Sequence, residues 1–254
     1  MNGAERKQAI LQLLQEKESI HVDELTERFG VSKVTIRGDL DILQQKGLLV
    51  RTHGGAMLPE KRDFIRIISN TIHESTREKD EIAKLAASLV SSGQAIIIDS
   101  GSTTMHMAKY LADKQVTVAT NSLLVMQQLM NEDNVDLVVI GGSLRRFSMS
   151  AIGSIARSCL TQIHADWLFL GGSGYSVEKG ITCSNLVEAD TKQAMIQNAE
   201  HVCFVADSSK MGRVSFANVT DWSHIDVLVT DRIDTETRIC LEGFGVRVMV
   251  PKHA

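Results

Sequence analysis

The run Asp99-Ser100-Gly101-Ser102-Thr103-Thr104 has the residue types of a phosphate-binding turn, because it is short, rich in hydroxyls and contains a glycine. It follows a predicted strand and precedes a predicted helix. Gly101 permits a tight turn, and the N–H groups and hydroxyls after it would gather at a helix start, where free donors and the helix dipole favour an anion. A sugar phosphate would suit such a site. The alternative interpretation is a capped helix without a ligand, since Ser and Thr are ordinary at helix starts.

Other polar residues follow the other predicted strands. Asn121 comes after the second strand, Gly171 and Gly172 after the fourth, and the segment 207–210 after the fifth. Asp207 offers a carboxylate to sugar hydroxyls, and Lys210 offers an ammonium group to a phosphate. In open α/β sheets, ligands bind beyond the carboxyl ends of the strands. The predicted small-molecule site comprises Asp99, Ser100, Gly101, Ser102, Thr103, Thr104, Asn121, Gly171, Gly172, Glu188, Asp207 and Lys210.

Glu188 and Lys192 are weaker candidates for that site. Glu188 stands four residues before Lys192 on a predicted helix. Such a pair is usually a surface ion pair worth a few tenths of a kcal/mol. The sequence predicts no cofactor and no metal site. Its four cysteines (Cys159, Cys183, Cys203 and Cys240) are far apart, form no CxxC pair and are expected to be reduced thiols, mostly packed in the interior.

A second group of residues suits contact with nucleic acid. The stretch 31–56, VSKVTIRGDLDILQQKGLLVRTHGGA, predicts a helix capped by Ser32, a stop at Gly47, a short wing strand over 48–52 and a turn over 53–55. A short amphipathic helix over 22–29 precedes it and ends at Gly30. The predicted apolar stripe of the second helix consists of Val34, Ile36, Leu40, Leu43 and Leu48.

Two helices joined by so short a turn cross steeply, which leaves the second one able to enter a DNA major groove. Arg37 lies away from the apolar stripe and can pair with guanine, while Lys and Thr can reach phosphate or base edges. The alternative is a small helical subdomain that packs against a partner, and the pattern alone leaves both open. The predicted DNA contacts are Ser32, Lys33, Thr35, Arg37, Arg51 and His53.

Composition describes an ordinary globular protein of 254 residues, with 43% hydrophobic and 23% charged residues. The formal net charge is −4, and even the segment 30–53 carries only four basic and two acidic side chains, a formal +2. Affinity for DNA must therefore come from local placement of charge and from dimerisation. The N-terminus lacks the pattern of a secretory signal, and no apolar run approaches the ~20 residues of a membrane span. We expect a cytoplasmic protein with no membrane partner.

The elements predict two domains. A first helix over 4–17, the two helices above and a wing that pairs with 20–22 form a winged helix-turn-helix domain, 1–57, followed by a linker, 58–75. Residues 76–254 alternate strand and helix, which indicates an α/β domain with a mostly parallel sheet. Its predicted strands cover 94–99, 116–120, 136–140, 166–170, 201–206, 226–230 and 246–250, and its helices 74–90, 103–112, 122–130, 153–162, 188–199 and 235–242.

The stretch VSKVTIRGDL, followed by LQQKGLLVRTHGGA, resembles the DNA-binding signature of the DeoR family of bacterial sugar-operon regulators. One position departs from the family pattern, which usually has a second Arg where this chain has Gly38. Residues from about 76 to 250 resemble the effector domain of that family, which is similar in fold to ribose-5-phosphate isomerase. DSGSTT resembles the phosphate loop of the isomerase, and ADSSK at 206–210 resembles its DxSK segment. DSGSTTM, TNSL and GSIARS favour regulators of sugar-alcohol and amino-sugar operons within the family.

The resemblance implies a DNA-binding repressor of a carbohydrate-utilisation operon, and not an enzyme. Its partners would be double-stranded operator DNA, a phosphorylated sugar or sugar alcohol as effector, and further copies of the chain in a dimer or tetramer. The alternative is a sugar-phosphate isomerase-like enzyme with an appended DNA-binding module. Its catalytic set looks incomplete, because the glycine-rich segment 170–174 contains no lysine. A third interpretation, an oligomerisation domain with an empty pocket, ranks lowest.

Overall fold

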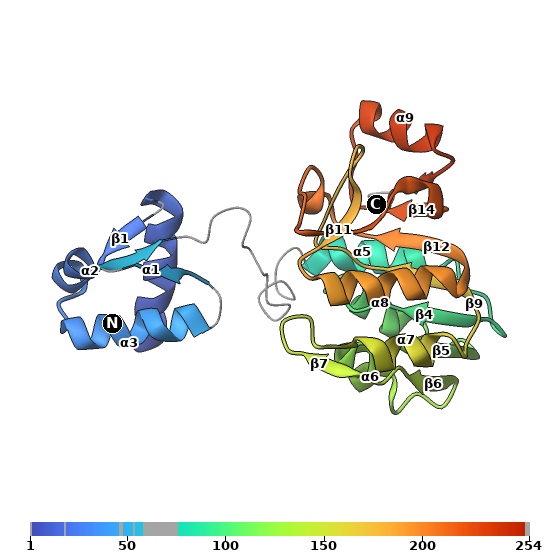
Figure 1. Cartoon of the computed structure of the whole chain (residues 1–254), viewed down its shortest axis with the longest axis horizontal. Helices are drawn as coiled ribbons and strands as arrows, with labels where there is room; N and C mark the ends of the chain where they lie inside the picture. The colour runs from blue at the N-terminus through green and yellow to red at the C-terminus, as the bar shows by residue number, and fades with distance from the viewer. Residues whose placement is uncertain (1, 18, 46–47, 53, 58–75, 252–254) are drawn as a thin grey trace. The chain divides into compact units, whose positions relative to one another are not determined.

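The computed structural model describes residues 2–17, 19–45, 48–52, 54–57 and 76–251 (Figure 1). The chain divides into two compact units, Met1–Ile67 and Ile68–Ala254. This division falls inside the segment 58–75, which lies outside the described residues, so the linker stays a prediction.

The first unit is a winged helix-turn-helix. Its helices are α1 (Gly3–Lys17), α2 (Val22–Phe29) and α3 (Lys33–Gln45), and its strands are β1 (Ser19–His21), β2 (Val50–Arg51) and β3 (Gly55–Met57). The three strands form an antiparallel sheet in the order β1-β3-β2, in which Ile20 and Arg51 both pair with Ala56. The segment predicted to pair with the wing therefore does so through β3, and not with the strand predicted over 48–52.

Two local signals set the turn between α2 and α3, as predicted. Gly30 has a φ of 62°, a conformation that costs glycine little, and its N–H donates to the carbonyl of Thr26 at 3.0 Å. Ser32 then caps α3, because its Oγ accepts from the N–H of Thr35 at 3.1 Å. The predicted stop at Gly47 lies outside the described residues.

The core of the first unit corrects one predicted position. Ile36, Leu40 and Leu43 are buried against α1, α2 and β1, but Val34 is 77% exposed. Residues advance by about 100° around a helix, so Val34 lies roughly 160° from Ile36 and belongs to the opposite face. The apolar stripe of α3 therefore begins at Ile36.

Asp39 is a buried charge that links α1 to α3. Its side chain is 7% exposed, and Oδ2 lies 2.6 Å from Nε of Arg6 while Oδ1 lies 3.6 Å from Nζ of Lys7. A carboxylate inside a small core is costly unless it is paired in this way. Asp39 thus fixes α3 against α1.

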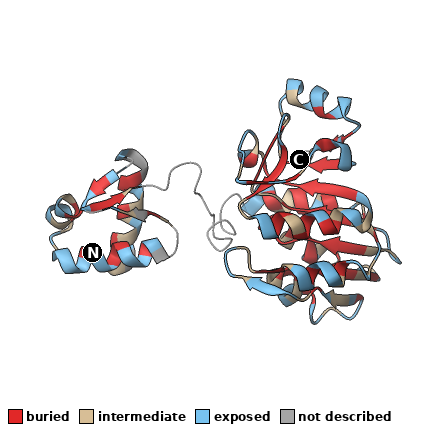
Figure 2. Ribbon diagram, in the orientation of Figure 1, coloured by how far each residue is buried: buried red, intermediate tan, exposed pale blue. Residues whose placement is uncertain are grey.

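The second unit is built on a seven-stranded parallel sheet with the order β15-β14-β12-β9-β4-β5-β6. All seven strands were predicted, and most bounds agree within two residues. Their residues are largely buried on both faces, as Figure 2 shows. The strands are β4 (Ala95–Ile98), β5 (Val116–Thr120), β6 (Val135–Val139), β9 (Ala165–Leu170), β12 (Ala199–Val205), β14 (Val227–Val229) and β15 (Arg247–Met249).

Helices cover both faces of this sheet. Ile96 and Ile98 belong to one buried cluster and Ile97 to another, since side chains alternate along a strand. The first cluster includes α5 (Thr76–Ala87), η1 (Thr104–Tyr110) and α6 (Leu123–Leu129). The second includes α7 (Ser154–Leu160), α8 (Leu186–Gln197) and α9 (Thr235–Gly243).

One predicted helix differs in kind, and two small sheets were not predicted. The helix expected over 103–112 is the 3₁₀ helix η1. A hairpin joins β7 (Ser143–Arg145) to β8 (Ser150–Ile152), and an antiparallel sheet joins β10 (Gly174–Ser176), β11 (Gly180–Cys183) and β13 (Ala217–Thr220). Within the described parts of the chain, no helix has the length and apolar content needed to cross a membrane.

Candidate functional site

The order of the parallel strands reverses between β4 and β9. From β4 the chain proceeds outward through β5 to β6, and it then crosses back to β9 and proceeds the other way through β12, β14 and β15. Ligands in such sheets bind at the carboxyl ends of the strands, where the order reverses. Asp99 follows β4 and Gly171 follows β9 at this point, and the N–H of Gly171 donates to Oδ2 of Asp99 at 2.9 Å.

Asp99 links the end of β4 to α8 through a buried ion pair. Its side chain is fully buried, and Oδ2 also accepts from the ammonium group of Lys192, which itself is 2% exposed. Lys192 donates in addition to the carbonyl of Gly171 at 3.3 Å. Burial alone would lower the pKa of Lys192, but the carboxylates of Asp99 and Glu188 raise it above its ordinary value. The pair fixes the ends of β4 and β9 relative to α8.

Glu188 extends this charge network to a hairpin. Its Oε1 lies 3.8 Å from Nζ of Lys192, and its Oε2 accepts from Nε of Arg145 at 3.1 Å. Arg145, on β7, also donates to Ser184 Oγ at 3.2 Å. Glu188 and Lys192 are therefore both buried in this network and do not form the surface ion pair that their spacing usually indicates. Helical spacing showed that they are neighbours, but the side of α8 on which they lie depends on partners far away in the sequence.

The turn after β4 is tight, as the presence of Gly101 predicted, and it is closed by hydrogen bonds among its own residues. Thr104 Oγ1 donates to the carbonyls of Asp99 at 2.8 Å and Gly101 at 3.2 Å, and a Cβ at Gly101 would lie 2.9 Å from that hydroxyl. The predicted contribution of an α-helix dipole was wrong, because η1 is a seven-residue 3₁₀ helix without a side-chain cap. The groups at this turn that could still bind an anion are its backbone N–H groups and hydroxyls.

Two buried polar atoms at this edge lack a hydrogen-bond partner among the described residues. They are Oγ1 of Thr103 and Oδ1 of Asn121, which follow the adjacent strands β4 and β5. Nδ2 of Asn121 donates to the carbonyl of Ala151 at 3.0 Å, and this contact fixes the amide orientation, since a carbonyl only accepts. A buried polar atom without a partner costs about 1–3 kcal/mol. Both atoms suit a polar ligand that would supply the missing contacts.

Two lysines accompany a carboxylate at the end of β12. Lys210, 9% exposed, donates to the carbonyl of Gly172 at 2.9 Å. Burial alone would raise the pKa of Asp207, but Lys210, the Ser209 hydroxyl and Lys79 together hold it below its ordinary value. Lys79 is 2% exposed and belongs to α5, so sequence reasoning missed it. A signal was present, because Lys79 interrupts an apolar stripe of α5 at helical spacing.

The predicted residues that follow β4, β5, β9 and β12 lie at the carboxyl edge of the sheet, whereas Glu188 and Lys192 belong to α8. Arg145 and Lys79 were not predicted. No group of three or more His, Cys, Asp or Glu side chains suited to hold a metal ion occurs in the described ranges.

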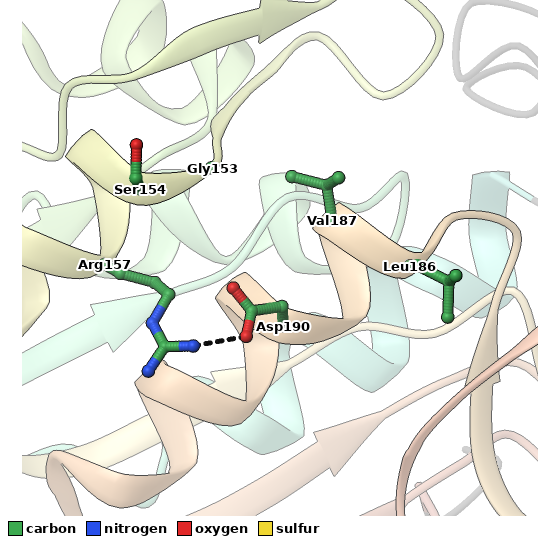
Figure 3. A pocket seen from close by; sticks show the side chains of 6 residues that line it. All are labelled: Gly153, Ser154, Arg157, Leu186, Val187 and Asp190. Atoms are coloured by element: carbon green, nitrogen blue, oxygen red, sulfur yellow. Dashed lines mark hydrogen bonds and ion pairs between the residues drawn. The ribbon is translucent and has the colours of Figure 1, made fainter.

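A surface hollow lies elsewhere, between the starts of α7 and α8 (Figure 3). Arg157 and Asp190 form an ion pair across it, and Leu186 and Val187 lie exposed at its rim. None of the predicted ligand residues lines it. Because its only charged groups already pair with each other, the hollow is not suited to a phosphate.

The residues predicted to contact DNA from α3 differ in whether they already form contacts with other residues of the chain. Ser32 caps the helix, and exposed Lys33 pairs with Asp23 at 2.7 Å. Thr35 is exposed, with its hydroxyl 2.9 Å from that of Ser32. Arg37 is exposed and forms no side-chain hydrogen bond or ion pair with any described residue. It is therefore the cation on α3 best placed to contact a base.

The wing supports α3. Nη1 of Arg51 lies 2.6 Å from Oδ1 of Asp41 and donates to the carbonyl of Arg37 at 3.1 Å. Arg51 therefore fixes the wing to the helix and positions Arg37. His53 lies outside the described residues, so its role stays a prediction.

Family models match both units of the chain. Residues 6–62 match the DeoR-like helix-turn-helix domain, and residues 74–232 match the DeoR C terminal sensor domain. A solved structure of ribose 5-phosphate isomerase A from Methanocaldococcus jannaschii overlaps 53% of this chain and 54% of its own, at 18% identity and a TM-score of 0.40.

Three curated relatives cover nearly the full length. The putative aga operon transcriptional repressor of Escherichia coli O157:H7 is 34% identical over 97% of this chain and 93% of its own. The transcriptional repressor GlcR of Bacillus subtilis is 34% identical over 100% and 98%. The glycerol-3-phosphate regulon repressor of Escherichia coli K12 is 32% identical over 91% and 92%. These names indicate a regulator rather than an enzyme, and with both domain matches they show that the chain belongs to the DeoR family of transcriptional regulators.

Proposed function

We propose that the chain represses a carbohydrate-utilisation operon and that a phosphorylated sugar or sugar alcohol, bound at the carboxyl edge of the parallel sheet, controls its affinity for DNA. The observation that carries the proposal is the pair of unpartnered polar atoms, Thr103 Oγ1 and Asn121 Oδ1, beside a hydroxyl-rich turn at the strand-order reversal. The names of the relatives support the class of operon, since one refers to the aga operon and another to the glycerol-3-phosphate regulon.

The two ends of the site suit the two ends of such a ligand. The backbone N–H groups and hydroxyls of Ser102 and Thr103, with the nearby ammonium groups, suit a phosphate. The free carbonyl oxygen of the Asn121 side chain suits a sugar hydroxyl, which can donate to it. Because Lys79 belongs to α5, the first described helix after the segment 58–75, a phosphate near it would act on the start of the sensor domain.

The contacts of the carboxylates support a binding role over a catalytic one. Isomerisation of a sugar phosphate needs a carboxylate that can take a proton from carbon. Asp99 is held by Lys192 and by the N–H of Gly171, and Asp207 accepts from Ser209 and lies close to Lys210. Both carboxylates are buried and already accept hydrogen bonds from other groups of the chain. Neither is therefore positioned to act as a general base on a ligand.

The ligand can change DNA affinity only if it binds the DNA-competent and DNA-incompetent states with different free energies. The experiment that tests the proposal is a titration of the full chain with DNA from upstream of its own gene, with and without a panel of sugar and sugar-alcohol phosphates. We expect one phosphate to shift the apparent Kd by at least about tenfold, a coupling of ~1.4 kcal/mol. DNA binding that no phosphate changes would remove the effector proposal, and turnover of a phosphate without DNA binding would favour the enzyme.

Replacing Lys210 by alanine is expected to leave DNA affinity unchanged and to raise the effector concentration needed for half-maximal response by at least about tenfold. The reason is that a hydrogen bond to a charged group contributes about 1.5–3 kcal/mol. Titration of the preformed DNA complex with the active phosphate measures this.

Lys114→Ala is the matched control for this substitution. Lys114 also donates to backbone carbonyls, those of Ala87 and Val90, but it precedes β5 and so lies at the opposite edge of the sheet. A full effector response in Lys210→Ala, or an equal loss in Lys114→Ala, would show that Lys210 supports the fold only.

A further inference from the structure

The centre of the exposed face of α3 is apolar. Val34, in the first turn, is 77% exposed, whereas Ile36, Leu40 and Leu43 are buried. At about 100° per residue, Val34 lies close to the direction directly opposite the middle of the buried face. A β-branched apolar side chain gains nothing for the helix in that position, because it restricts its own rotamers and packs against no core.

Gly38 lies one turn after Val34 on the same face. A Cβ added to it would meet nothing within 4 Å, and its φ is not positive. Neither packing nor backbone conformation therefore requires a glycine, and glycine inside a helix is unfavourable. Together, Val34 and Gly38 give the first two turns of α3 an uncharged surface with little side-chain bulk.

The polar groups lie beside or beyond this surface. Arg37 and Thr35 are exposed on either side of it, and Asp41, the next residue on the face, is paired with Arg51 at 2.6 Å. In a helix-turn-helix, the first residues of the second helix approach base edges while neighbouring side chains contact phosphates. Thymine is the base that presents a methyl group in the major groove, and apolar side chains contact it.

We infer that Val34 is a specificity-determining residue of this chain, and that its methyl groups pack against the C5-methyl group of a thymine in each operator half-site. Gly38 contributes by allowing the helix backbone to approach the base pair that follows. This inference rests on the proposed binding of operator DNA. It adds a residue outside the predicted set of polar contacts, and it specifies which base feature that residue recognises.

The test combines one change in the protein with one change in the DNA. The full chain first selects its preferred duplex from a random pool, and each thymine of that duplex is then replaced by deoxyuridine, which lacks only the methyl group. We expect one thymine per half-site at which this replacement weakens binding by about fourfold, the equivalent of one buried methyl group. Val34→Ala should weaken binding to the thymine duplex and be insensitive to deoxyuridine at that position.

Ile42→Ala is the control, because Ile42 is a partly exposed apolar residue on the same helix, roughly 80° around from Val34. It should retain the full loss with deoxyuridine, and thermal unfolding should show both variants folded. The inference is overturned if no thymine is sensitive in the wild-type protein, or if Val34→Ala keeps the full sensitivity. If the wild-type chain selects no sequence at all, the proposed function fails and the inference fails with it, a result distinct from sequence-specific binding without methyl dependence.

Discussion

Replacing Lys192 by methionine is expected to lower the free energy of unfolding of the second unit by about 3–5 kcal/mol, because it leaves a buried carboxylate without its partner. Asp99 is fully buried, and among the described residues it would keep the N–H of Gly171 and weak contact with Ser100. Methionine keeps much of the volume of lysine, so a cavity would not account for the loss. The ends of β4 and β9 would then lose the contact that fixes them to α8.

Urea denaturation followed by tryptophan fluorescence measures this effect. Both tryptophans, Trp167 and Trp222, belong to the second unit, so the signal reports on that unit alone. The matched control is Glu242→Ala, which removes an i, i+4 ion pair with Arg238 whose two side chains are each about half exposed, and which leaves the hydrogen bond from Arg238 to the carbonyl of Val248. That change should cost less than about 1 kcal/mol.

A double variant, Lys192→Met with Asp99→Asn, separates the loss of a partner from the loss of packing. Removing both charges should recover part of the lost stability, since the cost lies mainly in the charge left alone. If Lys192→Met costs no more than Glu242→Ala, the ion pair does not stabilise this edge of the sheet. If the double variant recovers nothing, the methylene groups of Lys192 rather than its charge are responsible.

The sequence predicted the main sheet because its strands carry their own signals. Runs such as AIII at 95–98 are continuous apolar segments, which suit strands buried on both faces. The hairpin of β7 and β8 has no such signal, since Leu144 is exposed and both strands have three residues. Arg145 was missed for the same reason, because its contact with Glu188 exists only once the hairpin has formed.

The positions of the predicted ligand residues followed from the sequence, but their contacts with other residues of the chain did not. Strand ends place Asp99, Gly171 and Asp207 at one edge of a parallel sheet whatever their contacts are. Whether Asp99 faces a ligand or an internal cation depends on Lys192, 93 residues later in the chain. Similarly, Val34 fits an apolar stripe by residue type, and only the packing of α1 and α2 decides which side of α3 is buried.

Replacing Arg37 by alanine is expected to weaken binding to the specific operator by about 10–100-fold, since a bidentate contact with guanine contributes about 1–3 kcal/mol of discrimination. Gly38 stands where the family usually has a second arginine, so this chain has one fewer arginine on the exposed face of α3 and depends more on Arg37. The change removes no core contact, because Arg37 is exposed and unpaired among the described residues. The protein should therefore stay folded.

The measurement must distinguish a lost base contact from a lost positive charge, and Arg28→Ala supplies the comparison. Arg28 is exposed at the end of α2, and its removal changes the net charge of the same unit by the same amount. Affinities for the operator and for a shuffled duplex should be measured over a range of salt concentrations. Arg37→Ala should reduce the ratio of the two affinities, whereas Arg28→Ala should change both alike or neither. Equal losses on both duplexes in Arg37→Ala would place its side chain on a phosphate, and base recognition by α3 would then depend on Thr35 and the uncharged surface around Val34.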